Sequence, residues 1–168
     1  REEFKNSSAS IRFNNQTIGA QPYGSLIQVA PDKLLGTTLS GGSSISGTIY
    51  EFTLSTGAVV LKQTYTGTNG SKPYGGLVDG GDGIYYGTTS EGGTANEGTI
   101  YSYDYATNSI QTRASFGAFN LNHPHCNLTK ASDGWFYGIT HGYGVNSDRG
   151  GLFRYNPINQ QLELIKQF

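Results

Sequence analysis

The chain has 168 residues, with 11 Lys and Arg against 12 Asp and Glu, so its formal net charge at pH 7 is −1. That balance excludes nucleic acid and anionic membranes as the main partners, because both are bound through basic patches. The 25 glycines and 12 tyrosines indicate short strands and tight turns rather than helices. No apolar run approaches the roughly 20 residues of a membrane-spanning helix, so we expect no membrane insertion.

A segment of about 51 residues occurs three times in the chain. Pro22, Pro73 and Pro124 stand 51 residues apart, and the alignment slips by one residue only between Gly144 and Gly150 of the third copy. Self-similarity at a fixed period is the signature of repeat architectures. We therefore predict one repeat domain, 1–168, with a partial copy over 1–20 and full copies over 21–72, 73–122 and 123–168.

Each copy predicts four strands, and the second copy shows them most clearly. Its strands are expected over 75–80, 84–90, 98–105 and about 109–117. Asp82 and Gly83, between the first two strands, tolerate the positive φ angles that a two-residue hairpin turn requires. A longer glycine-rich loop separates the second strand from the third, and a short turn joins the third to the fourth.

The third strand of each copy alternates strictly between its two faces. In the second copy, Tyr101, Tyr103 and Tyr105 share one face and Ser102 and Asp104 the other. The equivalent face carries Tyr50, Phe52 and Leu54 in the first copy, and Phe153, Tyr155 and Pro157 in the third. Agreement at period two fixes the register of a strand, because a one-residue slip would turn every side chain to the other face.

Tandem groups of four short antiparallel strands are the pattern of a β-propeller, in which each group forms one blade. We therefore predict an all-β fold of about three and a half blades, each a four-stranded antiparallel meander. The alternative is a β-trefoil-like threefold fold, which has no place for the partial copy. Propellers typically have 4–8 blades, so we expect either a homo-oligomer that completes the ring or the remainder of a longer chain.

The motifs resemble one known family. The combination of Pro-Tyr-Gly, Asp-Gly, Tyr-Gly-Thr-Thr, Gly-Gly and Gly-Thr-Ile-Tyr in the second copy is similar to the GloVer tandem repeat of bacterial surface and secreted proteins. The resemblance implies an exported, propeller-shaped protein without established catalytic residues. The chain departs from the pattern at 31–33 in the first copy, and at His125, Cys126, Ile139 and near Asp148 in the third.

The meander sorts the loops onto two rims, with tight turns on one and longer loops on the other. Binding residues concentrate on variable loops held by a rigid scaffold, so the long-loop rim is the expected binding face. Aromatic rings there would stack on a sugar, and amides and carboxylates would bond its hydroxyls. The candidate ligand-binding residues are Tyr74, Glu91, Asn96, Asn122, His125, His141, Tyr143, Asn146, Asp148 and Arg149.

These residues predict a non-catalytic binding or adhesion module, extracellular or on the cell surface, with a glycan as the expected ligand. One alternative is a structural spacer or self-assembling unit of a larger surface protein. Another is a metal-dependent enzyme that uses His123, His125 and His141, whose spacing matches no zinc finger. We expect no metal and no cofactor. Tyr23 and Trp135 are expected to be buried, and Cys126 to pack against backbone as a small buried residue.

Overall fold

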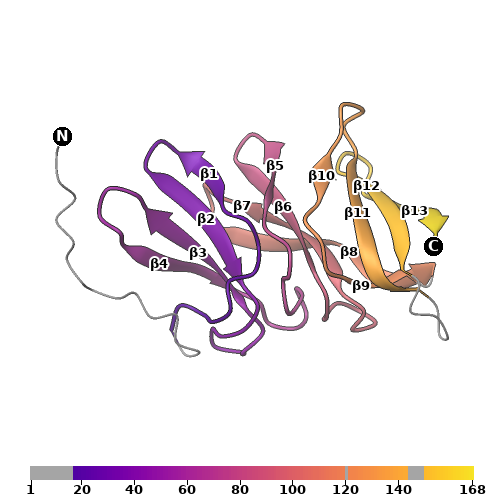
Figure 1. Ribbon diagram of the computed structural model, residues 1–168, viewed down its shortest axis with the longest axis horizontal. Coiled ribbons are helices and arrows are strands. Elements are labelled where there is room, and N and C mark those ends of the chain that lie inside the picture. Colours follow the sequence, from indigo (N-terminus) through magenta and orange to yellow (C-terminus); the bar gives the residue numbers. More distant parts are fainter. Residues whose placement is uncertain (1–16, 120, 144–149) are drawn as a thin grey trace.

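A computed structural model of the protein describes residues 17–119, 121–143 and 150–168. Within these residues every regular element is a β-strand, and the strands form three antiparallel sheets that stand side by side in chain order (Figure 1). The all-β prediction is therefore confirmed. In the part of the chain so described, no helix is long and apolar enough to span a membrane.

Each sheet is one repeat copy folded as a meander. Blade 1 consists of β1 (Ile27–Ala30), β2 (Lys33–Thr38), β3 (Thr48–Thr53) and β4 (Val59–Thr64), paired in that order. Blade 2 consists of β5 (Val78–Gly81), β6 (Ile84–Thr89), β7 (Thr99–Asp104) and β8 (Ser109–Phe119). Blade 3 consists of β10 (Thr129–Lys130), β11 (Phe136–Tyr143), β12 (Gly151–Asn156) and β13 (Gln161–Gln167), with β9 (Leu121–Pro124) paired to the far end of β11.

The hairpin turn predicted between the first two strands of the second copy is present. Asp82 and Gly83 have φ angles of 53° and 75°, the left-handed conformation that both central residues of a type I′ turn adopt. Asp82 tolerates this region better than most residues with a side chain, and Gly83 has no Cβ to obstruct it. The turn sets the register of β5 on β6.

Two apolar clusters fill the spaces between the blades. Residues of blades 1 and 2 form the first cluster: Leu35, Ile49, Tyr65, Leu77, Tyr85, Tyr101 and Tyr103. Residues of blades 2 and 3, with Leu121 of β9, form the second: Tyr86, Ile100, Phe116, Leu121, Leu128, Phe136, Phe153 and Tyr155. The predicted alternation along β7 is thus confirmed, since Tyr101 and Tyr103 face blade 1 while Ile100 faces blade 3. A single blade buries its faces only by packing against its neighbours.

The segments that lead into the first strand of each blade pack backbone against backbone. A Cβ on Gly75 would overlap the carbonyl oxygen of Cys126 and lie 2.8 Å from its carbonyl carbon, and one on Gly24 would lie 2.5 Å from the amide nitrogen of Gly76. Threonines add a hydrogen bond at each of these two junctions: Thr37 Oγ1 donates to Gly75 O over 3.0 Å, and Thr88 Oγ1 donates to Cys126 O over 3.1 Å. Glycine and threonine in the repeat therefore set the distance between blades.

Trp135 is not part of the core, and its predicted burial is wrong. It is half-buried directly before β11, where the guanidinium carbon of Arg154 lies 4.2 Å from its ring centroid. Arg154 alternates along β12 with the buried Phe153 and Tyr155, so it projects from the face of blade 3 that no other described blade covers. A sequence position just after a turn does not indicate which face its side chain takes.

Candidate functional site

The loops lie on two rims, as the meander predicts. In Figure 1 the β1–β2, β5–β6 and β10–β11 turns lie along the upper edge, and the connections between blades lie along the lower edge. We call the second edge the long-loop rim; its described parts include the β2–β3 loop (39–47), the β6–β7 loop (90–98) and the β4–β5 connection (65–77). Tyr74, Glu91 and Asn96 all belong to these segments.

Three equivalent positions of the repeat carry aromatic rings that lie next to one another. The centroids of Tyr23 and Tyr74 are 5.8 Å apart, and those of Tyr74 and His125 are 4.1 Å apart. His141, in β11, continues the series with its centroid 5.2 Å from that of His125. We call Tyr23, Tyr74, His125 and His141 the ring row. The first three rings lie in line because each repeat has a proline followed by a ring-bearing residue in the segment ahead of its first meander strand.

Tyr23 is 65% exposed, so the expectation that it is buried is wrong. Tyr23 and Tyr74 occupy equivalent positions of the repeat. Tyr74 lies between two other rings, whereas Tyr23 lies at the end of the row. Among the described residues, only the Tyr74 ring contacts the Tyr23 ring. Tyr23 therefore offers a free aromatic surface, and its equivalence to the predicted site residue Tyr74 was the signal that could have identified it.

An ion pair stands beside the row. Lys72 Nζ and Glu91 Oε1 are 2.6 Å apart, and this hydrogen bond raises the pKa of Lys72. Backbone hydrogen bonds fix both residues: Ser71 pairs with Glu91, and Lys72 N donates to Ser46 O over 2.9 Å. Backbone bonds thus hold the charged pair at the junction between blades 1 and 2.

Two of the three histidines stack on each other, and the third has other partners. His123 lies with Nδ1 2.7 Å from Ser90 O and Nε2 3.2 Å from Glu97 Oε2, whereas His125 stacks between Tyr74 and His141. Burial, together with the nearby His141 and His123, lowers the pKa of His125, so at neutral pH it acts as an uncharged ring. In the described portion of the chain, no three His, Cys, Asp or Glu side chains are arranged to hold a metal ion.

Cys126 contacts backbone, as the sequence predicts, but the residue is half-buried rather than buried. Its Sγ lies 3.2 Å from both the amide nitrogen and the carbonyl oxygen of Ile139 on the neighbouring strand. Burial raises the pKa of the Cys126 thiol, which disfavours the thiolate that acts as a metal ligand or nucleophile.

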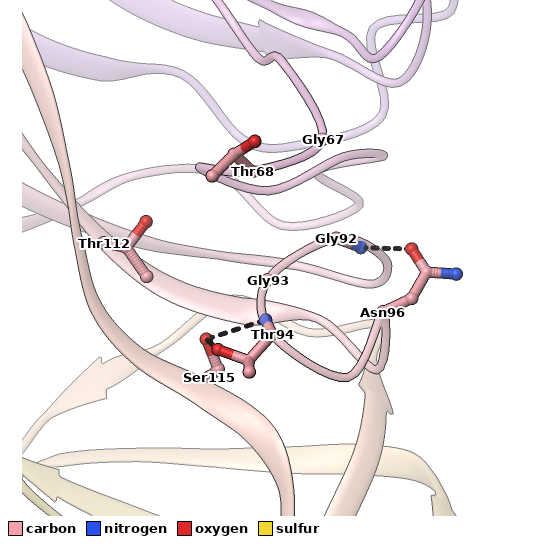
Figure 2. A pocket seen from close by; sticks show the side chains of 8 residues that line it. All are labelled: Gly67, Thr68, Gly92, Gly93, Thr94, Asn96, Thr112 and Ser115. Atoms are coloured by element: carbon pink, nitrogen blue, oxygen red, sulfur yellow. Dashed lines mark hydrogen bonds between the residues drawn. The ribbon is translucent and has the colours of Figure 1, made fainter.

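Asn96 belongs to a second feature of the same rim, a surface pocket of about 530 Å³ (Figure 2). Its Oδ1 accepts a hydrogen bond of 3.0 Å from Gly92 N, so the side chain braces the β6–β7 loop. The pocket begins one residue beyond the ion pair in the chain, because Gly92 directly follows Glu91. Sequence reasoning did not identify the pocket itself.

The remaining predicted residues are distributed as follows. Asn122 lies in β9, and no described residue bonds its buried Oδ1. Tyr143 is the last residue of β11, where its backbone pairs with Leu121. The predicted Asn146, Asp148 and Arg149 lie outside the described residues. The structure thus places Tyr74, His125 and His141 in the ring row and Glu91 beside it, whereas Asn96 lies in a separate pocket of the same rim.

Radially stacked four-stranded meanders with all connections on two rims define a β-propeller protein built from tandem repeats. The chain belongs to the Gloeobacter/Verrucomicrobia repeat family, whose model matches residues 4–168. No curated protein matches the chain in sequence.

Solved β-propeller structures share the fold at low sequence identity. A chain of the nidogen/laminin complex superposes with a TM-score of 0.57 at 13% identity, over 81% of this chain and 44% of that one. An oligogalacturonate lyase from Vibrio parahaemolyticus gives 0.54 at 15%, over 88% and 39%. TolB from Acinetobacter baumannii gives 0.50 at 19%, over 80% and 29%. The chain therefore spans less than half the length of each of these proteins, and the likeness establishes the fold alone.

Proposed function

We propose that the chain is a non-catalytic, exported binding module that holds a carbohydrate on its long-loop rim, with the ring row as the platform. The observation that carries the proposal is the recurrence of a ring at one repeat position in three consecutive blades, ending in the exposed Tyr23. Recognition sites use aromatic rings in this way because a ring presents a large, rigid apolar surface at low entropic cost.

The surroundings of the row supply the polar part of carbohydrate recognition. The apolar face of a sugar packs on a ring while its hydroxyls need donors and acceptors, and mainly apolar sites with a few placed polar groups provide both. Lys72 and Glu91 offer a charged donor and a charged acceptor beside the row, fixed 2.6 Å apart. Repeated blades would also add avidity where several weak contacts engage one polymer.

A glycan array tests the proposal with two matched aromatic variants. Tyr23→Ala removes the exposed ring of the row, and Trp135→Ala removes a larger, half-buried ring from the opposite rim. We expect saturable binding by the native chain, a loss of about tenfold or more in Tyr23→Ala, equivalent to roughly 1.4 kcal/mol, and native binding in Trp135→Ala. Absence of saturable binding, or equal loss in both folded variants, would overturn the proposal.

Two further readouts separate binding from catalysis. Bound glycans are incubated with the native chain for hours and analysed by mass spectrometry, and we expect them to be recovered intact. The array is repeated with EDTA, and we expect the same binding. Cleaved glycan would instead favour the enzyme alternative, and binding abolished by EDTA would show that a metal ion takes part.

A further inference from the structure

We propose that the pocket beside Asn96 is a second carbohydrate subsite, which takes one neutral, polyhydroxylated sugar ring. The inference rests on the proposed function and extends it from the ring row to the outer part of blade 2. The pocket has a volume of about 530 Å³, within the roughly 300–1,000 Å³ typical of small-ligand sites.

The composition of the lining selects an uncharged ligand. Two loops and strand β8 contribute to it, and its residues are Gly67, Thr68, Gly92, Gly93, Thr94, Asn96, Thr112 and Ser115. None of these side chains is ionisable. A charged group placed here would lose hydration without gaining a counter-charge, whereas hydroxyls and amides match the mixed donor and acceptor pattern of a sugar.

The hydrogen-bonding capacity of the pocket is largely unused. Figure 2 shows Thr68 and Thr112 on one side of the pocket and Thr94 and Ser115 on another. Among the described residues, the hydroxyls of Thr68 and Thr112 have no partner. Ser115 Oγ makes only long contacts, 3.4 Å to Thr94 N and 3.5 Å to Thr94 Oγ1, and contacts of this length are weak. These hydroxyls remain free to bond a ligand.

The pocket walls are fixed before any ligand arrives. Gly93 N donates to Gly67 O over 3.0 Å, which holds the β4–β5 connection against the β6–β7 loop. The Asn96 side chain closes the same loop through Gly92 N at 3.0 Å. A preorganised site loses little conformational entropy on binding, so weak individual hydrogen bonds suffice for measurable affinity.

Blade 1 provides an internal comparison. Its Ser43 and Thr64 repeat the Thr94–Ser115 contact, with their hydroxyls 3.5 Å apart. However, Ile45 and Leu61 stand where blade 2 has Asn96 and Thr112. The backbone is the same at the first of these positions, with φ of 57° at Ile45 and 59° at Asn96. Of these two blades, only blade 2 therefore combines the loop geometry with a polar lining.

Nuclear magnetic resonance titration tests the subsite directly. The probes are the methyl glycosides of glucose, galactose and mannose, each titrated into the ¹⁵N-labelled native chain, with glucuronate as the charged comparison. We expect at least one neutral glycoside to shift the amide signals of Gly93, Thr94 and Ser115 with a millimolar Kd, and glucuronate to bind more weakly.

Hydroxyl-deleting variants locate the contacts. Thr68→Val and Thr112→Val keep the side-chain shape and remove one hydroxyl each, while Thr129→Val does the same at an exposed position on blade 3. We expect Kd to rise about fivefold in each pocket variant, as for loss of one hydrogen bond, and to stay unchanged in Thr129→Val.

The outcomes distinguish this inference from the proposed function. Shifts confined to residues around Tyr23 and Tyr74 would overturn the pocket subsite and leave the ring row supported. Shifts in the pocket that persist in Tyr23→Ala would support the subsite even if the array result overturned the ring row. Absence of shifts with all three neutral glycosides, or unchanged Kd in both pocket variants, would overturn the subsite.

Discussion

The ring of Tyr101 covers Gly87, its partner on the neighbouring strand, so that a Cβ at Gly87 would overlap the tyrosine hydroxyl and lie 2.6 Å from Cζ. Blade 1 repeats the arrangement with Gly36 under Tyr50, and blade 3 with Gly138 under a phenylalanine at the equivalent position. An aromatic side chain that covers a facing glycine on a sheet stabilises the pair, because the ring shields the bare backbone.

We expect Gly87→Ala to lower the free energy of unfolding by about 1–3 kcal/mol, the usual cost of overpacking a core. Tyr101 is fully buried, and its ring is the group that the added methyl would meet. A double-mutant cycle in urea denaturation measures the coupling. In the Tyr101→Ala background the added methyl group should cost much less, and additive effects would contradict this account.

The threonine bonds between blades predict a second set of effects. Thr37→Val and Thr88→Val each remove the hydroxyl donor to a carbonyl at a blade junction, buried for Gly75 and part-buried for Cys126, so each should lower the free energy of unfolding by about 1–2 kcal/mol. Ile139 occupies the equivalent position in blade 3 and is 50% exposed. Ile139→Thr should therefore change stability by less than about 0.5 kcal/mol. Urea denaturation compares the three variants, and equal effects in all of them would refute the role of the bonds.

A charged hydrogen bond between blades makes stability depend on pH. Tyr105 Oη donates to Glu51 Oε2 over 2.7 Å, which raises the pKa of Tyr105 to about 12. Burial alone would raise the pKa of Glu51, but hydrogen bonds from Tyr105 and Lys33 and the charge of Lys62 lower it below 4.5. Because the folded pKa of Glu51 is depressed, its stabilisation is complete above about pH 4.5 and is lost as the pH falls through that pKa.

Tyr105→Phe should cost about 1 kcal/mol at pH 7, since the site is partly exposed and the bond is charge-assisted. The difference from the native chain should shrink toward pH 3. Tyr103→Phe is the control, because Tyr103 Oη donates instead to the neutral Asn108 Oδ1 at 2.8 Å, and its cost should not vary between pH 3 and 7. Urea denaturation across this range checks both, and a constant Tyr105→Phe deficit would disprove the coupling.

Cys126 should react slowly with alkylating reagents. Its pKa is raised above the ordinary 9.0, so the thiolate fraction at neutral pH is smaller than in a free thiol. Iodoacetamide alkylation followed by mass spectrometry should be slower than alkylation of glutathione at pH 7.5. Denaturation in urea should abolish the difference, and a native rate equal to that of glutathione would contradict the burial of Sγ.

Much of the fold could be predicted from the repeat alone. The expected starts of β6 at Ile84 and β8 at Ser109 match the structure, and the β7 prediction differs by one residue at each end. The same alternation of inward and outward residues occurs in all three copies. This agreement fixes the strand register more firmly than the residue preferences of one copy could. Contacts between blades were not predictable, because the bond from Thr88 to Cys126 O depends on how far one sheet is rotated from the next.

The sequence predicted which rim carries the candidate site. It did not predict the exposed ring of Tyr23 or the pocket on that rim. Tyr74 and His125 were recognised because they sit on long-loop connections, yet the free ring of Tyr23 follows from its place at the end of the row. The pocket was missed for a different reason. Thr68, Thr112 and Ser115 are ordinary residues in a chain rich in hydroxyls, and they meet only because Gly67 bonds Gly93 across two loops.

The replacement of glycine by Cys126 has a consequence for any neighbour of blade 3. At Gly24 and Gly75 the absence of a side chain lets the equivalent segment of the next blade approach to backbone contact, whereas Cys126 carries a Cβ and a sulfur at that point. A further sheet that packed on blade 3 at Cys126 would have to lie farther from blade 3, or be shifted along its strands, than the sheets at Gly24 and Gly75. The rotation from blade 3 to such a sheet would therefore differ from the rotations between blades 1 and 2 and between blades 2 and 3. The rotational symmetry of the repeat would end at that interface.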